Sequence, residues 1–314
     1  MVAYLFAGQG AQYVGMGKDL YNTFPESKAV FDKAQDVLGW NLKAQCFDGP
    51  EDMLKMTHIS QPAVLTMSIA AFEAFKAVVG LRIEEAGFTA GLSLGEYSAL
   101  VASGVLKFED AVRVVRKRAD LMNNAALKNP GKMAAIIGLD TAVIKEACIN
   151  IGKVEVANFN CPGQVVISGE KAAVDKAKTL ALEKGAKKTV DLDVSGAFHS
   201  SLMREAAREY GDFIKDHLVL TEAKIPVVSN VDAAAKSKAT EFSESLVKQI
   251  YSSVLWEGSM RFMLSQGITK YYEFGPGKVL KGLMRRIDPK AEVINIEKKE
   301  DILNLNKEEV NNAS

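Results

Sequence analysis

Short apolar segments alternate along the chain with longer segments in which apolar residues recur at helical spacing. The short segments mostly end at glycine, serine or asparagine, as buried strands do, and they are 3–7, 88–92, 225–229, 271–274 and 292–296. The main helical segments are 61–79, 108–126, 201–217, 243–251 and 277–287. Because strands alternate with helices, we predict an α/β fold with a mostly parallel sheet covered on both faces. Ligands bind outside the carboxyl ends of the strands in such sheets, so we expect the chemistry in the turns that follow them.

The middle of the chain predicts a different order of elements. A strand, a helix, two strands joined by a turn, a second helix and a closing strand are expected at 132–138, 141–151, 153–159, 165–168, 171–184 and 187–192. This β-α-β-β-α-β order is ferredoxin-like. We therefore expect a ferredoxin-like subdomain at 127–195, inserted into a discontinuous core formed by 1–126 and 196–300. The chain from Lys298 onward is polar, and residues 301–314 are expected to form a frayed tail.

Composition and charge limit the classes of partner. Lys and Arg total 39 and so do Asp and Glu, so no general affinity for nucleic acid or an anionic membrane is expected. The three cysteines are widely spaced and form no CxxC pair, which indicates free thiols in a reducing compartment and no zinc site. The N-terminal segment lacks the basic start of a signal peptide, and no apolar run approaches the ~20 residues that span a bilayer. We expect a cytoplasmic protein.

A GxSxG pattern at 91–95 surrounds Ser93, with a strand-like segment before it and a helix-like segment after it. At such a tight turn the flanking glycines remove side chains that would clash, and the serine hydroxyl points at the substrate beside a helix N-terminus. Ser93 is therefore the candidate nucleophile, and the backbone amide of Leu94 is a candidate donor to an oxyanion. The alternative is a glycine-rich turn without a catalytic role, which the flanking elements disfavour.

A serine nucleophile needs a base, and the chain has only three histidines. His217 lies in a charged helical segment and is predicted to be on the surface, whereas His58 is predicted to be a capping or packing residue in a loop. His199 follows a strand-like segment and a loop of small residues, so it is the best candidate for the general base. The glycine-rich turn at 7–12 contains Gln9, whose amide is a candidate second oxyanion donor. That turn lacks the GxGxxG and GKS/T patterns of nucleotide sites.

Eight stretches of the sequence together resemble the malonyl-CoA:acyl carrier protein transacylases and the related acyltransferase domains of polyketide synthases. They run in the family's order from residue 6 to about residue 283 and are FAGQGAQYVGMG, SQPAVLTMS, GLSLGEYSAL, AVRVVRKRA, ANFNCPGQVVISG, SGAFHSSLM, VVSNVDA and EFGPGKVLKGL. The resemblance implies that Ser93 is the nucleophile, that His199 is its base, and that Gln9 and Leu94 form the oxyanion hole. It also implies that a backbone carbonyl orients the histidine, and the matching position is Leu255.

The resemblance further implies which residues hold the acyl group. Arg118 matches the arginine that grips the free carboxylate of a malonyl group, a role that suits a planar guanidinium. Gln61 matches a polar residue of the pocket wall, and Phe198 matches a bulky residue that disfavours a methyl branch on the substrate. The chain departs from the family at Leu92, because the family usually has histidine before the serine. This substitution is expected to make the pocket wall less polar.

The function implied is transfer of a malonyl group from malonyl-CoA to acyl carrier protein through a malonyl-Ser93 intermediate, in a monomer with an α/β-hydrolase-like core. Coenzyme A thioester would be a substrate, and no metal or bound cofactor is expected. The carrier protein is expected to be acidic, so a basic patch is predicted near the site, from Arg285 and Arg286 or from Lys184, Lys187 and Lys188. Three alternatives remain open: an acyltransferase for another acyl group, a serine hydrolase or thioester-editing enzyme that uses water as acceptor, and a non-catalytic docking subunit.

Overall fold

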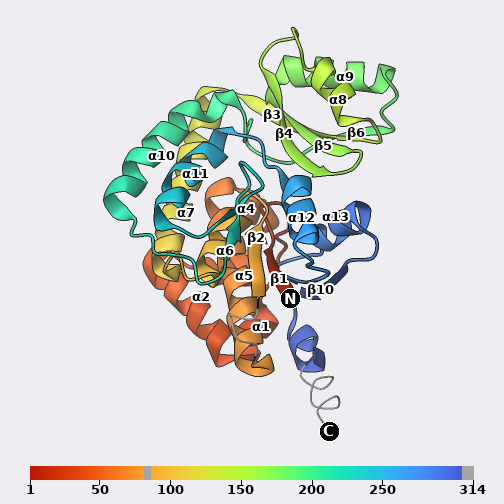
Figure 1. The fold of residues 1–314 in the computed structure, drawn as a ribbon. Coiled ribbons are helices and arrows are strands. Elements are labelled where there is room, and N and C mark those ends of the chain that lie inside the picture. Colours follow the sequence, from red (N-terminus) through yellow and green to blue (C-terminus); the bar gives the residue numbers. More distant parts are fainter. Residues whose placement is uncertain (81–85, 306–314) are drawn as a thin grey trace.

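The computed structural model describes residues 1–80 and 86–305 and contains two β-sheets. The larger sheet has six strands in the order β10-β9-β1-β2-β7-β8 (Figure 1). These strands are β1 Val2–Phe6, β2 Ala86–Gly91, β7 Val227–Val228, β8 Ala235–Lys236, β9 Lys270–Phe274 and β10 Glu292–Ile296. All neighbours in this sheet pair in parallel except β8, which runs antiparallel to β7. The prediction of a mostly parallel sheet is confirmed.

Helices cover both faces of this sheet, as the side chains of β1 illustrate. Tyr4 and Phe6 belong to a core that includes helix α5, whereas Ala3 and Leu5 belong to a separate core with helices α12 and α13. Neighbouring residues of a strand point to opposite faces, so an uninterrupted apolar strand is buried on both sides. The helices around the sheet are α1 Lys18–Thr23, α2 Pro25–Leu38, α3 Leu42–Phe47, α4 Glu51–Lys55, α5 Thr57–Val79, α6 Gly95–Ala102, α7 Phe108–Lys128, α10 Arg204–His217, α11 Ala239–Tyr251, α12 Trp256–Ser265 and α13 Val279–Ile287.

Helix α5 is the central helix of the larger core. It packs against α2, α6 and α7, and Figure 1 shows it beside the sheet. Its length and hydropathy match those of a helix that crosses a membrane, but 72% of its most apolar 18-residue segment is buried inside the protein. The expectation that no apolar run approaches that length is therefore wrong for α5, whose apolar character is explained by its position in the core.

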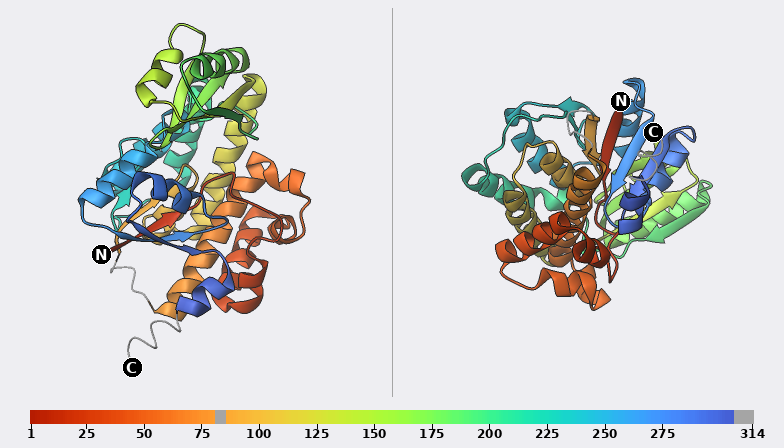
Figure 2. Two further views of the ribbon diagram at one scale, coloured as in Figure 1. Left: turned by 90° about the vertical axis from the view of Figure 1, so that its right-hand side faces the viewer. Right: turned by 90° about the horizontal axis from the view of Figure 1, so that it is seen from below.

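The second sheet is formed by the middle of the chain and lies at the top of Figure 1. Its four strands have the order β4-β5-β3-β6, and every pair is antiparallel. The elements are β3 Gly131–Ile137, α8 Thr141–Ala147, β4 Val154–Cys161, β5 Gln164–Glu170, α9 Lys171–Glu183 and β6 Lys188–Asp191. The predicted order of strands and helices is therefore observed. Figure 2 shows this unit at one end of the molecule, above the larger sheet.

Three details of the prediction differ from the structure. Helices α1–α4 and α12 were not among the predicted segments. His58 lies in the first turn of α5 and not in a loop, because the helix begins at Thr57 and includes Pro62. Residues 299–305 are helical and Ile302 is fully buried, so the tail is not frayed there. Residues 306–314 lie outside the described residues.

Candidate active site

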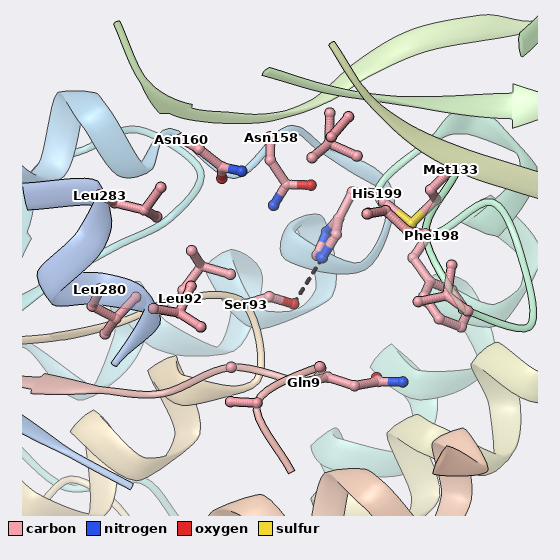
Figure 3. Close-up of a pocket in the computed structure, with 18 of the residues that line it drawn as sticks. Gln9, Leu92, Ser93, Met133, Asn158, Asn160, Phe198, His199, Leu280 and Leu283 are labelled. Carbon is pink, nitrogen blue, oxygen red and sulfur yellow. Dashed lines mark hydrogen bonds between the residues drawn. The ribbon is translucent and has the colours of Figure 1, made fainter. Parts of the chain in front are cut away.

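A cavity of about 250 Å³ lies where the carboxyl ends of β1 and β2 face the second sheet. Figure 3 shows its lining, with Ser93 and His199 near the centre and side chains of the second sheet above them. Most of the lining is apolar, which keeps water scarce around the few polar groups. The lining residues are Gly8, Gln9, Gly10, Ala11, Gln61, Leu92, Ser93, Arg118, Met122, Met133, Ala135, Asn158, Asn160, Gln164, Val166, Leu192, Val194, Phe198, His199, Val279, Leu280 and Leu283.

Ser93 stands on a tight turn between β2 and α6. Its φ angle of 51° is in the left-handed region, which is strained for a residue with a side chain. The turn is so close that a Cβ on Gly91 would lie 2.0 Å from the carbonyl oxygen of Gly95, and one on Gly95 would lie 2.2 Å from the carbonyl oxygen of Phe6. Both glycines are therefore required for the serine to adopt this position.

His199 contacts Ser93 directly. Its Nε2 lies 2.7 Å from Ser93 Oγ, and its Nδ1 lies 2.7 Å from the backbone carbonyl oxygen of Gln249, to which it donates when Nε2 accepts from the serine. Burial lowers the pKa of His199 to about 4, and the nearby charge of Arg118 adds to this effect. The imidazole is therefore neutral near pH 7, which is the state that a general base requires.

The residue that orients the histidine is Gln249, so the expectation for Leu255 is wrong. The carbonyl oxygen of Leu255 is used at the start of α12, where it accepts hydrogen bonds from the backbone amide and the hydroxyl of Ser259. Gln249 lies in the last turn of α11, where carbonyl groups have no partner within the helix. A helix end therefore supplies the free carbonyl that the resemblance to the family places at Leu255.

Arg118 reaches the cavity from α7, and it is almost fully buried. Its Nη1 donates to Gln61 Oε1 at 2.7 Å, and its Nη2 donates to Gln249 Oε1 at 3.0 Å and to Ser93 Oγ at 3.2 Å. All three acceptors are neutral. The guanidinium is thus a buried cation beside the serine, without a carboxylate among these partners.

The neighbouring cations of α7 have other partners. Arg113 pairs with Asp110, and Arg116 pairs with Asp120. Lys117 lies over the ring of Phe213. Arg118 is consequently the cation of this helix that lines the cavity, at the position that the resemblance to the family implies.

Gln61 and Gln9 form the polar floor beside the guanidinium. Gln61 is fully buried, and its Nε2 donates to Gln9 Oε1 at 3.1 Å while its Oε1 accepts from Arg118. The backbone amides of Gln9 and Leu94 have no acceptor among the turn and loop hydrogen bonds of the described residues. Both amides follow strands that pair side by side, β1 and β2, so they are available to an oxyanion.

Leu92 and Phe198 both line the cavity, from different sides in Figure 3. Leu92 lies near Leu280 of α13, so this wall is apolar where the family usually has histidine. Phe198 is nearly fully buried next to His199 and narrows the other side. Both side chains therefore form part of the cavity wall.

Sequence reasoning missed several polar residues of the site. Asn230 Oδ1 accepts from the backbone amide of Ser93 at 2.6 Å, and Gln249 Nε2 donates to the carbonyl of Ser93 at 2.9 Å. Asn158 and Asn160 project from β4 into the cavity, and Asn160 Oδ1 is buried without a partner among the described residues. Asn158, Asn160 and Asn230 stand in stretches that resemble the family, which is a usable signal; no such signal marks Gln249.

The other two histidines lie away from Ser93. His217 is exposed and stacks on Phe213 of its own helix, as expected. His58 is partly buried near Arg116, outside the residues that line the cavity. Within residues 1–80 and 86–305, no cluster of three or more His, Cys, Asp or Glu side chains is arranged to hold a metal ion.

Comparison with known proteins agrees with this arrangement. The model of the acyl transferase domain family matches residues 3–264. The malonyl CoA-acyl carrier protein transacylase of Bacillus subtilis is 43% identical, over 99% of each chain. An acyl carrier protein S-malonyltransferase from Vibrio cholerae has 39% identity and a TM-score of 0.92, over 97% of this chain and 99% of that one. A malonyl-transacylase in complex with its type II polyketide synthase acyl-carrier protein has 37% identity and a TM-score of 0.93, over 98% and 99%. The chain therefore belongs to the malonyl-CoA:acyl carrier protein transacylase family of acyltransferases.

Proposed function

We propose that this enzyme transfers a malonyl group from malonyl-CoA to the phosphopantetheine thiol of acyl carrier protein, through a malonyl-Ser93 intermediate with His199 as general base. The observation that carries the proposal is the position of Ser93 Oγ, 2.7 Å from His199 Nε2 and 3.2 Å from Arg118 Nη2. A base and a cation beside one hydroxyl suit an acyl donor that also carries a carboxylate. The names of the relatives in Bacillus subtilis and Vibrio cholerae support the same function.

In the first half-reaction, His199 Nε2 accepts the proton of Ser93 as Oγ bonds to the thioester carbonyl carbon. The backbone amides of Gln9 and Leu94 donate to the resulting oxyanion. The carbon–sulfur bond then breaks, and the coenzyme A sulfur leaves with the proton from His199. Through these steps, the hydrogen bond from Nδ1 to the Gln249 carbonyl stabilises the imidazolium that forms transiently.

The second half-reaction repeats these steps with a different thiol. His199 takes the proton of the phosphopantetheine thiol as its sulfur attacks the malonyl-Ser93 ester, and the released Ser93 oxygen recovers a proton from His199. The apolar part of the lining limits the access of water to the malonyl-Ser93 ester, which favours the thiol as acceptor.

The acyl specificity follows from Arg118 and Phe198. A malonyl group on Ser93 places its free carboxylate two carbons from the ester carbonyl, within reach of the guanidinium, which can hold it through two parallel hydrogen bonds. Phe198 crowds the opposite side of the cavity and disfavours a methyl branch, by about 1–3 kcal/mol. Malonyl-CoA is thus expected to be preferred over acetyl-CoA and methylmalonyl-CoA.

The proposed partner is an acidic carrier protein. Arg286 lies next to the cavity, because its Nη1 donates at 2.8 Å to Gln164, one of the lining residues. Lys184 pairs with Glu146, which makes it a weaker candidate for docking. We further propose that the enzyme is a cytoplasmic monomer that needs no metal or bound cofactor.

The architecture also has a finer interpretation. We infer an α/β-hydrolase-like core at 1–126 and 196–300 and a ferredoxin-like subdomain at 127–195. The β-α-β-β-α-β order and the strand order β4-β5-β3-β6 support the second assignment. The serine turn after a parallel strand supports the first.

One experiment tests the function directly. The enzyme is incubated separately with malonyl-CoA, acetyl-CoA and methylmalonyl-CoA, with and without holo acyl carrier protein. Intact-mass spectrometry then measures the acyl group attached to the enzyme and to the carrier protein. We expect malonyl to load on Ser93 preferentially, to pass to the carrier protein, and to be absent from Ser93→Ala. Release of the acyl group to water alone would identify a hydrolase or thioester-editing enzyme and would contradict the proposal.

A further inference from the structure

Glu96 is a buried carboxyl group that the mechanism above does not use. It stands in α6, three positions after Ser93, and is only 1% exposed. Its Oε2 accepts hydrogen bonds from Gln249 Nε2 at 2.7 Å and from the backbone amide of Asn230 at 3.3 Å. Burying a carboxylate is costly unless hydrogen bonds compensate for the lost hydration. The two hydrogen bonds to Glu96 provide this compensation, and they connect the carboxylate to residues of the candidate active site.

Gln249 joins Glu96 to Ser93, Arg118 and His199. Its Nε2 also donates to the carbonyl of Ser93, its Oε1 accepts from Arg118, and its backbone carbonyl accepts from His199. If the side-chain amide were flipped, its NH₂ group would face a guanidinium that only donates, and its oxygen would face a carboxylate that only accepts. An ionised Glu96 therefore selects one orientation of this amide.

Asn230 holds the same serine from the other side. Its Oδ1 accepts from the backbone amide of Ser93, and its Nδ2 donates to the carbonyl of Gly91 at 2.8 Å. The backbone amide and carbonyl of Ser93, a residue with strained φ, are thus each held by a residue bonded to Glu96.

We propose that Glu96 is a positioning residue whose buried carboxylate holds Gln249 and Asn230, and through them Ser93, Arg118 and His199. It touches neither the substrate nor the guanidinium. One side-chain amide separates it from Arg118, so it stabilises the buried cation without competing for the substrate carboxylate. The inference deepens the proposed function and rests on it.

The ionisation of Glu96 gives this role a measurable signature. Burial raises the pKa of Glu96 to about 7, and Asp232 adds to the rise, whereas Gln249, Asn230 and Arg118 oppose it. The charged side chains facing it are thus Arg118 from α7 and Asp232 from the loop after β7. The ionised, anchoring form is present above about pH 7 and is lost as the pH falls. Burial disfavours the ionised form of Glu96 in the folded protein. The free energy of unfolding therefore decreases as the pH rises from about 4.5 towards 7.

The test compares Glu96→Gln with wild type in the malonyl-loading half-reaction, followed by rapid quench between pH 5.5 and 8.5. We expect the wild-type rate to fall as the pH drops below about 7. In Glu96→Gln we expect a loading rate about 10-fold lower at pH 8 and no fall in rate as the pH drops through about 7. We also expect a melting temperature at pH 8 at least as high as that of wild type. A purely structural glutamate would instead lower the melting temperature and leave the shape of the profile unchanged.

Two further variants make the test specific. Glu244→Gln removes an exposed carboxylate of α11 that pairs with Lys248, and it should leave both rate and profile unchanged. Gln249→Leu combined with Glu96→Gln should be little worse than Gln249→Leu alone, because both changes break the same connection. The inference would be overturned by any of three results. The losses of rate in the double variant could be fully additive, Glu96→Gln could keep the wild-type pH profile, or the wild-type rate could show no fall near pH 7. Failure of the wild type to load malonyl would contradict the proposed function instead.

Discussion

Arg118 Nη2 lies 3.2 Å from Ser93 Oγ, although the two residues are 25 positions apart and belong to different elements. The contact places a permanent cation beside the candidate nucleophile in a cavity with an apolar lining. Such a cation would be costly to bury if the substrate carried no negative charge to bind it. An acyl group bound to Ser93 would therefore lie beside this cation, and a negatively charged acyl group would be favoured.

The role of the guanidinium can be measured by replacing it. In Arg118→Lys we expect malonyl loading to fall about 10- to 100-fold, because a lysine cannot form two parallel hydrogen bonds with a carboxylate. In Arg118→Gln we expect acetyl loading to exceed malonyl loading. Competition between malonyl-CoA and acetyl-CoA, followed by intact mass, reports both results. Arg116→Gln, which changes a cation of the same helix that pairs with Asp120, should leave the ratio unchanged; an unchanged ratio in Arg118→Gln would exclude the assigned role.

The protonation of His199 provides a second prediction. Its pKa is lowered to about 4 by burial and by the charge of Arg118, so the imidazole stays neutral as the pH falls from 8 to 5. Removing the charge in Arg118→Gln should raise this pKa towards the ordinary value of about 6.5. With only three histidines, titration by NMR can follow the Cε1–H signal of each ring. His58 is the internal control. If the pKa of His199 is the same in wild type and in Arg118→Gln, the electrostatic explanation is refuted.

Leu92 allows the unusual pocket wall to be tested. In Leu92→His, an imidazole N–H would face the cavity in place of an apolar side chain. One net hydrogen bond contributes about 0.5–1.5 kcal/mol, so we expect the malonyl-to-acetyl ratio of kcat/KM to rise about 2- to 10-fold. Steady-state kinetics with both thioesters measures the change. A ratio that stays constant would show that position 92 does not contact the acyl group.

The tight turn around Ser93 makes a prediction about stability. In Gly95→Ala, the new methyl group would lie 2.2 Å from the carbonyl oxygen of Phe6, so we expect a loss of about 1–3 kcal/mol in the free energy of unfolding, together with loss of acyl loading. Gly282→Ala is the matched control. Gly282 lies in α13 with no atom within 4 Å of the added Cβ, so alanine should stabilise the helix slightly. Denaturant unfolding compares the two, and equal stabilities would contradict the packing argument.

Much of this protein was determined by local sequence. Alternation of short apolar runs with helical segments predicted the parallel sheet and the inserted β-α-β-β-α-β unit, because burial on both faces leaves a continuous apolar strand. Glycines at 91 and 95 predicted the turn at Ser93, since no side chain fits there. The serine turn and the small number of histidines selected Ser93 and His199, whereas only the resemblance to the family selected Arg118. The structure then showed that the three residues lie together.

Only the tertiary structure decided which groups hold these residues in place. The carbonyl that binds His199 belongs to Gln249 and not to Leu255, because a helix end, rather than a sequence motif, leaves an acceptor free. Likewise, the link from Glu96 through Gln249 to Arg118 joins three helices, and nothing in the local sequence of each helix records it. A buried polar network depends on which atoms meet after folding, so its members are recognised by distance and burial rather than by spacing along the chain.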